Sequence, residues 1–137
     1  MGYEGHVIDL EDKAERESGC YECIQRLIDA RAAVEAAGLP CQICSASGTG
    51  DYYISTSFAG ITEVQAGSYA LMDAAYGRLD LGFYNALTVL TTVTSRPSPE
   101  QVITDAGLKS LTPEHGFPPV KDRPDLKCHA LSEEQGL

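Results

Sequence analysis

A long amphipathic segment, followed by a short apolar stretch and a glycine-rich turn, constrains the fold of this chain most strongly. Apolar side chains recur at three- and four-residue steps, which predicts one helix from Glu11 to Ala37. Gly38 stands where a helix C-cap is expected, and Pro40 prevents the helix from continuing. The next stretch, CQICSAS (41–47), is short and partly apolar, which predicts a buried strand. A helix and strand in this order, with a glycine-rich exit, are typical of an α/β fold.

The chain changes character after Tyr76. Residues 86–95, ALTVLTTVTS, are rich in β-branched side chains and predict a strand. The sequence RPSP (96–99) predicts a turn, and QVITDAG (101–107) predicts the next strand. We therefore expect an α/β part over residues 1–76 and an all-β part over residues 77–137.

Charge and hydropathy exclude two classes of partner. Twenty acidic residues against ten basic ones give a formal net charge of −10, which repels the phosphate backbone of nucleic acids. No apolar stretch approaches the roughly 20 residues that span a bilayer, and the N-terminus does not resemble a signal peptide. We expect a cytoplasmic protein whose five cysteines stay reduced.

Two C-x-x-C pairs, Cys20/Cys23 and Cys41/Cys44, have a spacing that is compatible with a four-cysteine zinc site. The expected local structure argues against it, because the first pair lies on the apolar face of the helix. The second pair lies three residues apart on a strand, so its side chains point to opposite faces. A zinc-binding interaction module is kept as an alternative, together with a small non-catalytic structural or ligand-binding protein.

The glycine-rich stretch SASGTGDY (45–52) directly follows the expected strand. It offers closely spaced main-chain N–H groups and hydroxyls, and its glycines let the main chain approach an anion. It is neither a Walker A loop nor a G-x-G-x-x-G fingerprint. From the residues alone, the stretch is either a phosphate-binding loop or an ordinary glycine-rich turn.

A second stretch, TEVQAGSYALMD (62–73), begins with strand-like alternation. Gly67 within such a strand indicates a bulge or the close approach of a ligand. Ser68 and Tyr69 would then offer hydroxyls near that ligand.

Four stretches together resemble one enzyme family. They are GYEGH (2–6), CSASGTGDY (44–52), TEVQAGSYALMDAAY (62–76) and ALTVLTTVTSRP…VITDAGLKSLT (86–112). In this order they resemble the D-threonine aldolase/D-serine dehydratase family of pyridoxal-phosphate enzymes. SEEQG (132–136) is similar to that family's SEEHG, with Gln135 in place of histidine.

The resemblance implies the alanine-racemase-like fold, in which a (β/α)₈ barrel is followed by a β-domain. Residues 1–76 would then be the last strands and helices of the barrel, and residues 77–137 the beginning of the C-terminal β-domain. GYEGH would be a late barrel strand and CQICSAS the next one. The glycine-rich loop would lie at the C-terminal end of a strand, where such barrels carry their chemistry.

The resemblance also implies a set of cofactor-binding residues. Gly48, Thr49 and Gly50 would hold the phosphate of pyridoxal 5′-phosphate, with Ser45 and Ser47 at the border of the loop. Tyr3 would lie beside the pyridine ring. Gln65, Gly67 and Tyr69 would lie near the phosphate or the ring edge.

Two parts of the family's chemistry are expected to lie outside this chain. The lysine that binds the cofactor aldehyde belongs to the start of the barrel, and Lys109, in the β-part, is not assigned that role. The divalent-metal ligands follow the SEEHG stretch, whereas this sequence ends at Leu137. We therefore expect the C-terminal half of a lyase for D-3-hydroxy amino acids, truncated or split from the rest and inactive alone. Retro-aldol cleavage or dehydration would be the parent reaction, and a homodimer or a complementary chain would supply the remainder.

Overall fold

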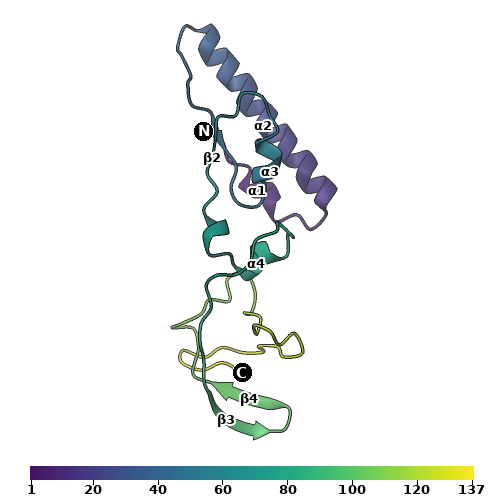
Figure 1. Ribbon diagram of the computed structural model, residues 1–137, viewed down its shortest axis with the longest axis vertical. Coiled ribbons are helices and arrows are strands. Elements are labelled where there is room, and N and C mark those ends of the chain that lie inside the picture. Colours follow the sequence, from purple (N-terminus) through teal and green to yellow (C-terminus); the bar gives the residue numbers. More distant parts are fainter. The chain divides into compact units, whose positions relative to one another are not determined.

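The computed structural model describes all residues, 1–137, and they form two compact units, Met1–Ala70 and Leu71–Leu137. The boundary between the units falls ahead of Tyr76, where the sequence pattern changes. The first unit contains four helical segments and two short strands, and the second is built mainly on a β-hairpin (Figure 1). No helix in either unit combines the length and the apolar character that a membrane crossing requires.

Helix α2 (Lys13–Ala36) is the longest element of the first unit (Figure 1). Its N-terminus is capped by Asp12, whose Oδ1 accepts a hydrogen bond from the Glu15 N–H at 2.9 Å. Its C-terminus is closed by Gly38, which has a φ of +83°, a conformation that glycine adopts without strain. The predicted helix is therefore confirmed, with bounds one or two residues inside those expected.

The buried face of α2 is narrower than the sequence pattern indicates. Cys20 and Ile24 are almost fully buried, and Arg16 extends the same stripe by one turn. Val34, ten residues beyond Ile24 on the same helix, is 44% exposed, so burial does not continue to the last turns of α2. Helices α1 (Gly5–Ile8) and α3 (Tyr52–Ser55) both contact α2.

A small parallel sheet lies beside these helices. Strands β1 (Ser45–Ala46) and β2 (Glu63–Val64) pair in parallel, with Ser45 opposite Glu63. The Gly2 N–H donates to the Ser45 carbonyl at 3.0 Å, so the N-terminal segment runs along β1 as well. The expected strand at 41–47 is thus reduced to two residues, and β2 is followed by the 3₁₀ helix η1 (Ser68–Ala70).

The second unit contains helix α4 (Ala74–Gly77) and an antiparallel hairpin of β3 (Val93–Ser98) and β4 (Gln101–Thr104). The strand expected over residues 86–95 was wrong for its first seven positions. There the main chain is held by a side chain instead of a ladder, since Asp105 Oδ1 accepts from the Thr92 N–H at 2.8 Å. The predicted turn at 96–99 was also misplaced, because β3 continues to Ser98 and the chain reverses at Pro99–Glu100.

The C-terminal segment returns to the hairpin. The Thr104 N–H donates to the Gly136 carbonyl at 2.8 Å, and the Gly136 N–H donates to the Thr104 carbonyl at 3.1 Å. The segment also encloses Gly107, whose main chain lies against residues 132–135. Residues from Leu111 onward otherwise form isolated bridges and turns, so the all-β character expected over residues 77–137 is largely confined to the hairpin.

Candidate anion-binding loop

The candidate site is the loop of residues 47–51, between β1 and α3. Ser47 leaves β1 with a φ of +63°, which turns the chain away from the strand direction. Thr49 and Asp51 are at most 2% exposed, and Gly50 is buried as well. This short, buried turn at the C-terminal end of a strand is the place where the sequence predicted phosphate binding.

The loop contains polar hydrogens without an acceptor. The Gly48 N–H donates to Asp51 Oδ1 at 3.0 Å, but the N–H groups of Thr49 and Gly50 make no hydrogen bond within the chain. Thr49 Oγ1 accepts from the Tyr69 N–H at 2.9 Å, which leaves its own proton available for donation. Buried N–H groups are nearly always paired, so an anion or water fits these donors.

A buried polar cluster supports the loop from beneath. Glu4 Oε1 accepts from Ser47 Oγ at 2.7 Å and from Ser55 Oγ at 3.4 Å, and the two hydroxyls are in direct contact. The Glu4 and Asp51 carboxyls are hydrogen bonded to each other. The Cys20 thiol donates to Asp51 Oδ2 at 3.7 Å.

The pKa values of the two carboxyl groups are shifted in opposite directions. Burial raises the pKa of Asp51 to about 7, and the hydrogen bond and charge of Glu4 add to that effect. Burial also opposes ionisation of Glu4, but hydrogen bonds from Asp51 and Ser47 outweigh it and lower the pKa of Glu4. Burial next to these carboxyls raises the pKa of the Cys20 thiol to about 12, so this cysteine is not a nucleophile at neutral pH.

Asp51 is expected to make stability depend on pH. Its pKa in the folded chain lies above the 3.8 of an ordinary aspartate, so the unfolded chain loses the proton first as pH rises and stability falls between about pH 4 and 7. The lowered pKa of Glu4 acts only at more acidic pH. Asp51→Asn should therefore gain about 1–3 kcal/mol relative to the parent chain between pH 5 and pH 8. Urea unfolding at both pH values measures this gain, and an equal difference between the chains at both values would contradict it.

The structure brings most of the sequence-predicted residues together. The Tyr3 ring lies against Gly48, where an added Cβ would come within 3.3 Å of its Cε2 atom. Gln65 Nε2 donates to Ser45 Oγ at 2.8 Å, beside the loop. Gly67 differs from this set, since a Cβ added there would meet no atom within 4 Å and no hydrogen bond joins it to the loop.

The sequence reasoning missed the carboxyl groups beneath the loop. Glu4 lies inside the quoted GYEGH stretch and Asp51 directly after the glycines, yet neither was singled out. An acidic residue immediately after an anion-binding loop is a signal that could have been used, because its negative charge opposes anion binding unless it is paired or protonated. Ser55, four residues further on, carried no such signal.

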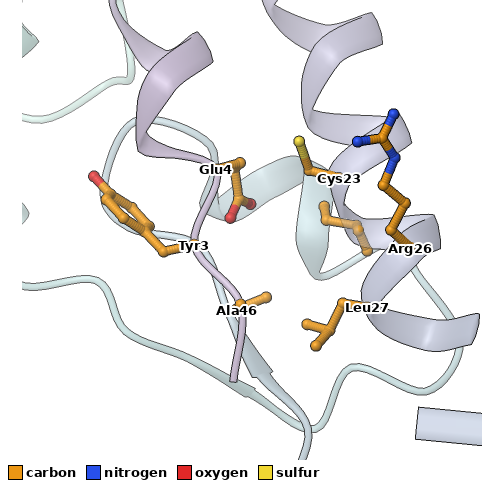
Figure 2. A pocket seen from close by; sticks show the side chains of 8 residues that line it. Tyr3, Glu4, Cys23, Arg26, Leu27 and Ala46 are labelled. Carbon is orange, nitrogen blue, oxygen red and sulfur yellow. The ribbon is translucent and has the colours of Figure 1, made fainter. Parts of the chain in front are cut away.

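A pocket of about 300 Å³ opens between the N-terminal segment and α2. In Figure 2, Cys23 and Leu27 on α2 face Glu4 and Ala46, whereas Tyr3 points away from α2. Its lining is mostly apolar apart from Glu4 and Arg26. The pocket shares Tyr3 and Glu4 with the surroundings of the loop, so the two features meet at the N-terminal segment.

The two C-x-x-C pairs do not form a common centre. Cys20 is directed to Asp51, and Cys41 Sγ lies 3.5 Å from the Ile43 carbonyl oxygen. All five cysteines are free thiols, and no group of three or more His, Cys, Asp or Glu side chains is arranged to hold a metal ion.

Known proteins resemble this chain over different parts of its length. The family model described as "Putative serine dehydratase domain" matches residues 86–137. The whole chain is 37% identical to a D-threonine aldolase from an Arthrobacter species and 36% identical to a 3-hydroxy-D-aspartate aldolase from Paracoccus denitrificans (strain Pd 1222). The chain belongs to the D-threonine aldolase/D-serine dehydratase family. It spans 37% and 38% of the length of these two relatives.

The chain has mixed α/β structure, and the solved structures that it resembles include an ala racemase-like protein from Idiomarina loihiensis, with a TM-score of 0.76 at 22% identity over 40% of that chain. The crystal structure of the D-threonine aldolase from Filomicrobium marinum superposes with a TM-score of 0.92 at 33% identity. That match covers 98% of this chain and 37% of the solved one. The expected family is therefore confirmed, and the roles of individual residues stay predictions.

Proposed function

We propose that this chain supplies the cofactor-phosphate loop of a pyridoxal-phosphate-dependent lyase that acts on D-3-hydroxy amino acids. The observation that carries the proposal is the pair of unpaired N–H groups at Thr49 and Gly50, in a buried loop at the end of β1. Main-chain donors in such a turn bind phosphate without a basic side chain. The likeness to two aldolases supports the choice of reaction.

All of the predicted residues except Gly67 have a proposed task in this site. Thr49 donates its hydroxyl proton to the phosphate while its oxygen holds the Tyr69 N–H. Gly48 allows the Tyr3 ring to lie directly on the loop, where that ring would be available to pack against the cofactor. Gln65 and Ser45 fix the β1–β2 edge beside the loop through their mutual hydrogen bond and would support the bound cofactor from there. Ser47 holds the turn from below through Glu4.

When bound, the cofactor withdraws the electrons released at the substrate α-carbon. None of the four lysines of this chain is placed to bind the cofactor aldehyde. Lys13, Lys109, Lys121 and Lys127 are all exposed, and Lys109 pairs with Glu134 at 2.7 Å. We propose that the covalent lysine and the metal ligands come from outside these 137 residues, and that this chain alone has no lyase activity.

The phosphate group itself should be what this chain recognises. Pyridoxal 5′-phosphate is expected to raise the melting temperature, whereas pyridoxal, which lacks the phosphate, should leave it unchanged. Thr49→Val removes the hydroxyl at nearly constant volume and is expected to weaken cofactor binding at least tenfold, in keeping with about 1.5–3 kcal/mol for one hydrogen bond to a charged group. Isothermal titration with both ligands measures the two effects.

Thr56→Val serves as the matched control, because Thr56 is exposed and its hydroxyl bonds only to the Tyr53 carbonyl. This control should bind the cofactor as the parent chain does. Equal binding of pyridoxal and its phosphate ester would reject the loop as a phosphate site.

Dehydration is a second candidate reaction, favoured by the serine dehydratase model that matches residues 86–137. The same loop would serve both reactions, because both begin at the substrate α-carbon. Product analysis on a longer polypeptide that contains this chain separates them. An aldehyde product indicates aldol cleavage, and release of ammonia indicates dehydration.

A further inference from the structure

The carboxyl groups of Glu4 and Asp51 form a buried pair directly under the proposed phosphate loop. Glu4 is 2% exposed and Asp51 is 0% exposed. Asp51 Oδ1 accepts from the Gly48 N–H at 3.0 Å, and Glu4 Oε1 accepts from Ser47 Oγ at 2.7 Å. Each carboxyl group thus holds one of the two residues that precede the free donors of Thr49 and Gly50.

No cation forms an ion pair with these carboxyl groups. Arg16, on the buried stripe of α2, donates to the Leu10 carbonyl instead, and Arg26 only lines the same pocket as Glu4. From α2 the groups that face it are the Cys20 and Cys23 thiols, and from α1 the His6 ring lies 3.8 Å from Cys23 Sγ. The group of α3 that contacts the carboxyl pair is the neutral Ser55 hydroxyl. No lysine, arginine or histidine side chain makes a hydrogen bond or ion pair with either carboxyl group.

An incoming dianion therefore meets one of two charge states. With both carboxyl groups ionised, two negative charges lie buried under the loop, and they repel a phosphate group strongly in a medium of low dielectric constant. With one shared proton, a single negative charge remains, and the hydrogen bonds to Gly48 and Ser47 are kept. The protonated pair is the arrangement that suits an occupied loop.

We infer that Glu4 and Asp51 are positioning residues that must share one proton for the loop to bind a phosphate group. The inference rests on the proposed function, since it concerns the same loop. Anion binding and proton uptake are then linked, and each favours the other. The pair acts through the loop and does not touch the cofactor.

Sulfate titrations test the link, because sulfate keeps its double charge between pH 6 and pH 8 whereas phosphate esters do not. The amide signals of Gly48 to Asp51 in the labelled chain report binding. With the pKa of Asp51 at about 7, the competent fraction falls about tenfold between these pH values, and sulfate affinity should fall by the same factor. Asp51→Asn keeps an acceptor for the Gly48 N–H and stays neutral, so its affinity should be the same at both pH values.

Glu4→Gln provides a second variant that leaves a single ionisable group in the pair. Its sulfate affinity should still fall with rising pH but with a midpoint at lower pH than in the parent chain, because burial continues to raise the pKa of Asp51 while the hydrogen bond and charge of Glu4 are gone. Equal pH slopes in the parent chain and both variants would overturn the shared proton while leaving the phosphate loop intact. If sulfate moves none of these amide signals at pH 6, the loop binds no anion, and both the proposed function and the link fail.

Discussion

Gly107→Ala is expected to destabilise the second unit by about 3 kcal/mol, near the upper end of overpacking effects. A Cβ at this position would overlap the main-chain nitrogen of Gln135 and the carbonyl oxygen of Ser132, and would lie 2.6 Å from the Glu134 carbonyl carbon. These atoms belong to the backbone and cannot swing aside as a side chain would. The same segment accepts the Leu108 N–H at 2.8 Å, so relief of the overlap would break that hydrogen bond.

Hydrogen exchange at the amides of residues 101–137 measures this loss, because local opening appears there directly. Gly77→Ala is the matched control, since the space around Gly77 is open and it lies in helix α4 with an ordinary φ. This control should be neutral or slightly stabilising. Similar exchange rates in the two variants would show that the enclosure of Gly107 is not rigid.

Ile24→Ala should lower the free energy of unfolding of the first unit by about 3 kcal/mol, as other large-to-small core substitutions do. Ile24 is 1% exposed and lies at the centre of the buried stripe of α2. Its removal leaves a cavity next to the pocket that it already lines, so the surrounding residues can only partly close the gap.

Val34→Ala on the same helix should change stability by less than about 0.5 kcal/mol, because Val34 is 44% exposed. Urea unfolding followed by the circular dichroism of α2 compares the two variants. A cost for Val34→Ala equal to that for Ile24→Ala would mean that the helix is buried along its whole length.

The elements that could be predicted from the sequence are those whose signals are local. Helix α2 has its cap at Asp12, its regular apolar stripe and its stop at Gly38, and all three act within a few residues. The prediction of a strand at 86–92 failed because a β-branched composition indicates that a segment can pair as a strand. It does not indicate whether a partner strand is present. Asp105, more than ten residues away, supplied the competing hydrogen bonds to Thr91 and Thr92.

The candidate site likewise contains residues with a local sequence signal and residues without one. The loop of residues 47–51 was visible as closely spaced glycines and hydroxyls after a strand. Glu4 was not visible, because its role depends on contacts to Ser47 and Ser55, which lie 43 and 51 residues away. Only the fold shows that these groups share one buried space.

Both the conformation of the loop and the hydrogen bonding of Glu4 depend on Ser47. Its φ of +63° would suit glycine better, yet glycine would lack the hydroxyl that donates to Glu4. Alanine would lose the hydroxyl and keep the backbone strain. A single residue therefore sets both the direction of the loop and the hydrogen bonding of the acid beneath it. Laboratory evolution of this loop could therefore not relieve the backbone strain with glycine without also removing the hydrogen bond to Glu4.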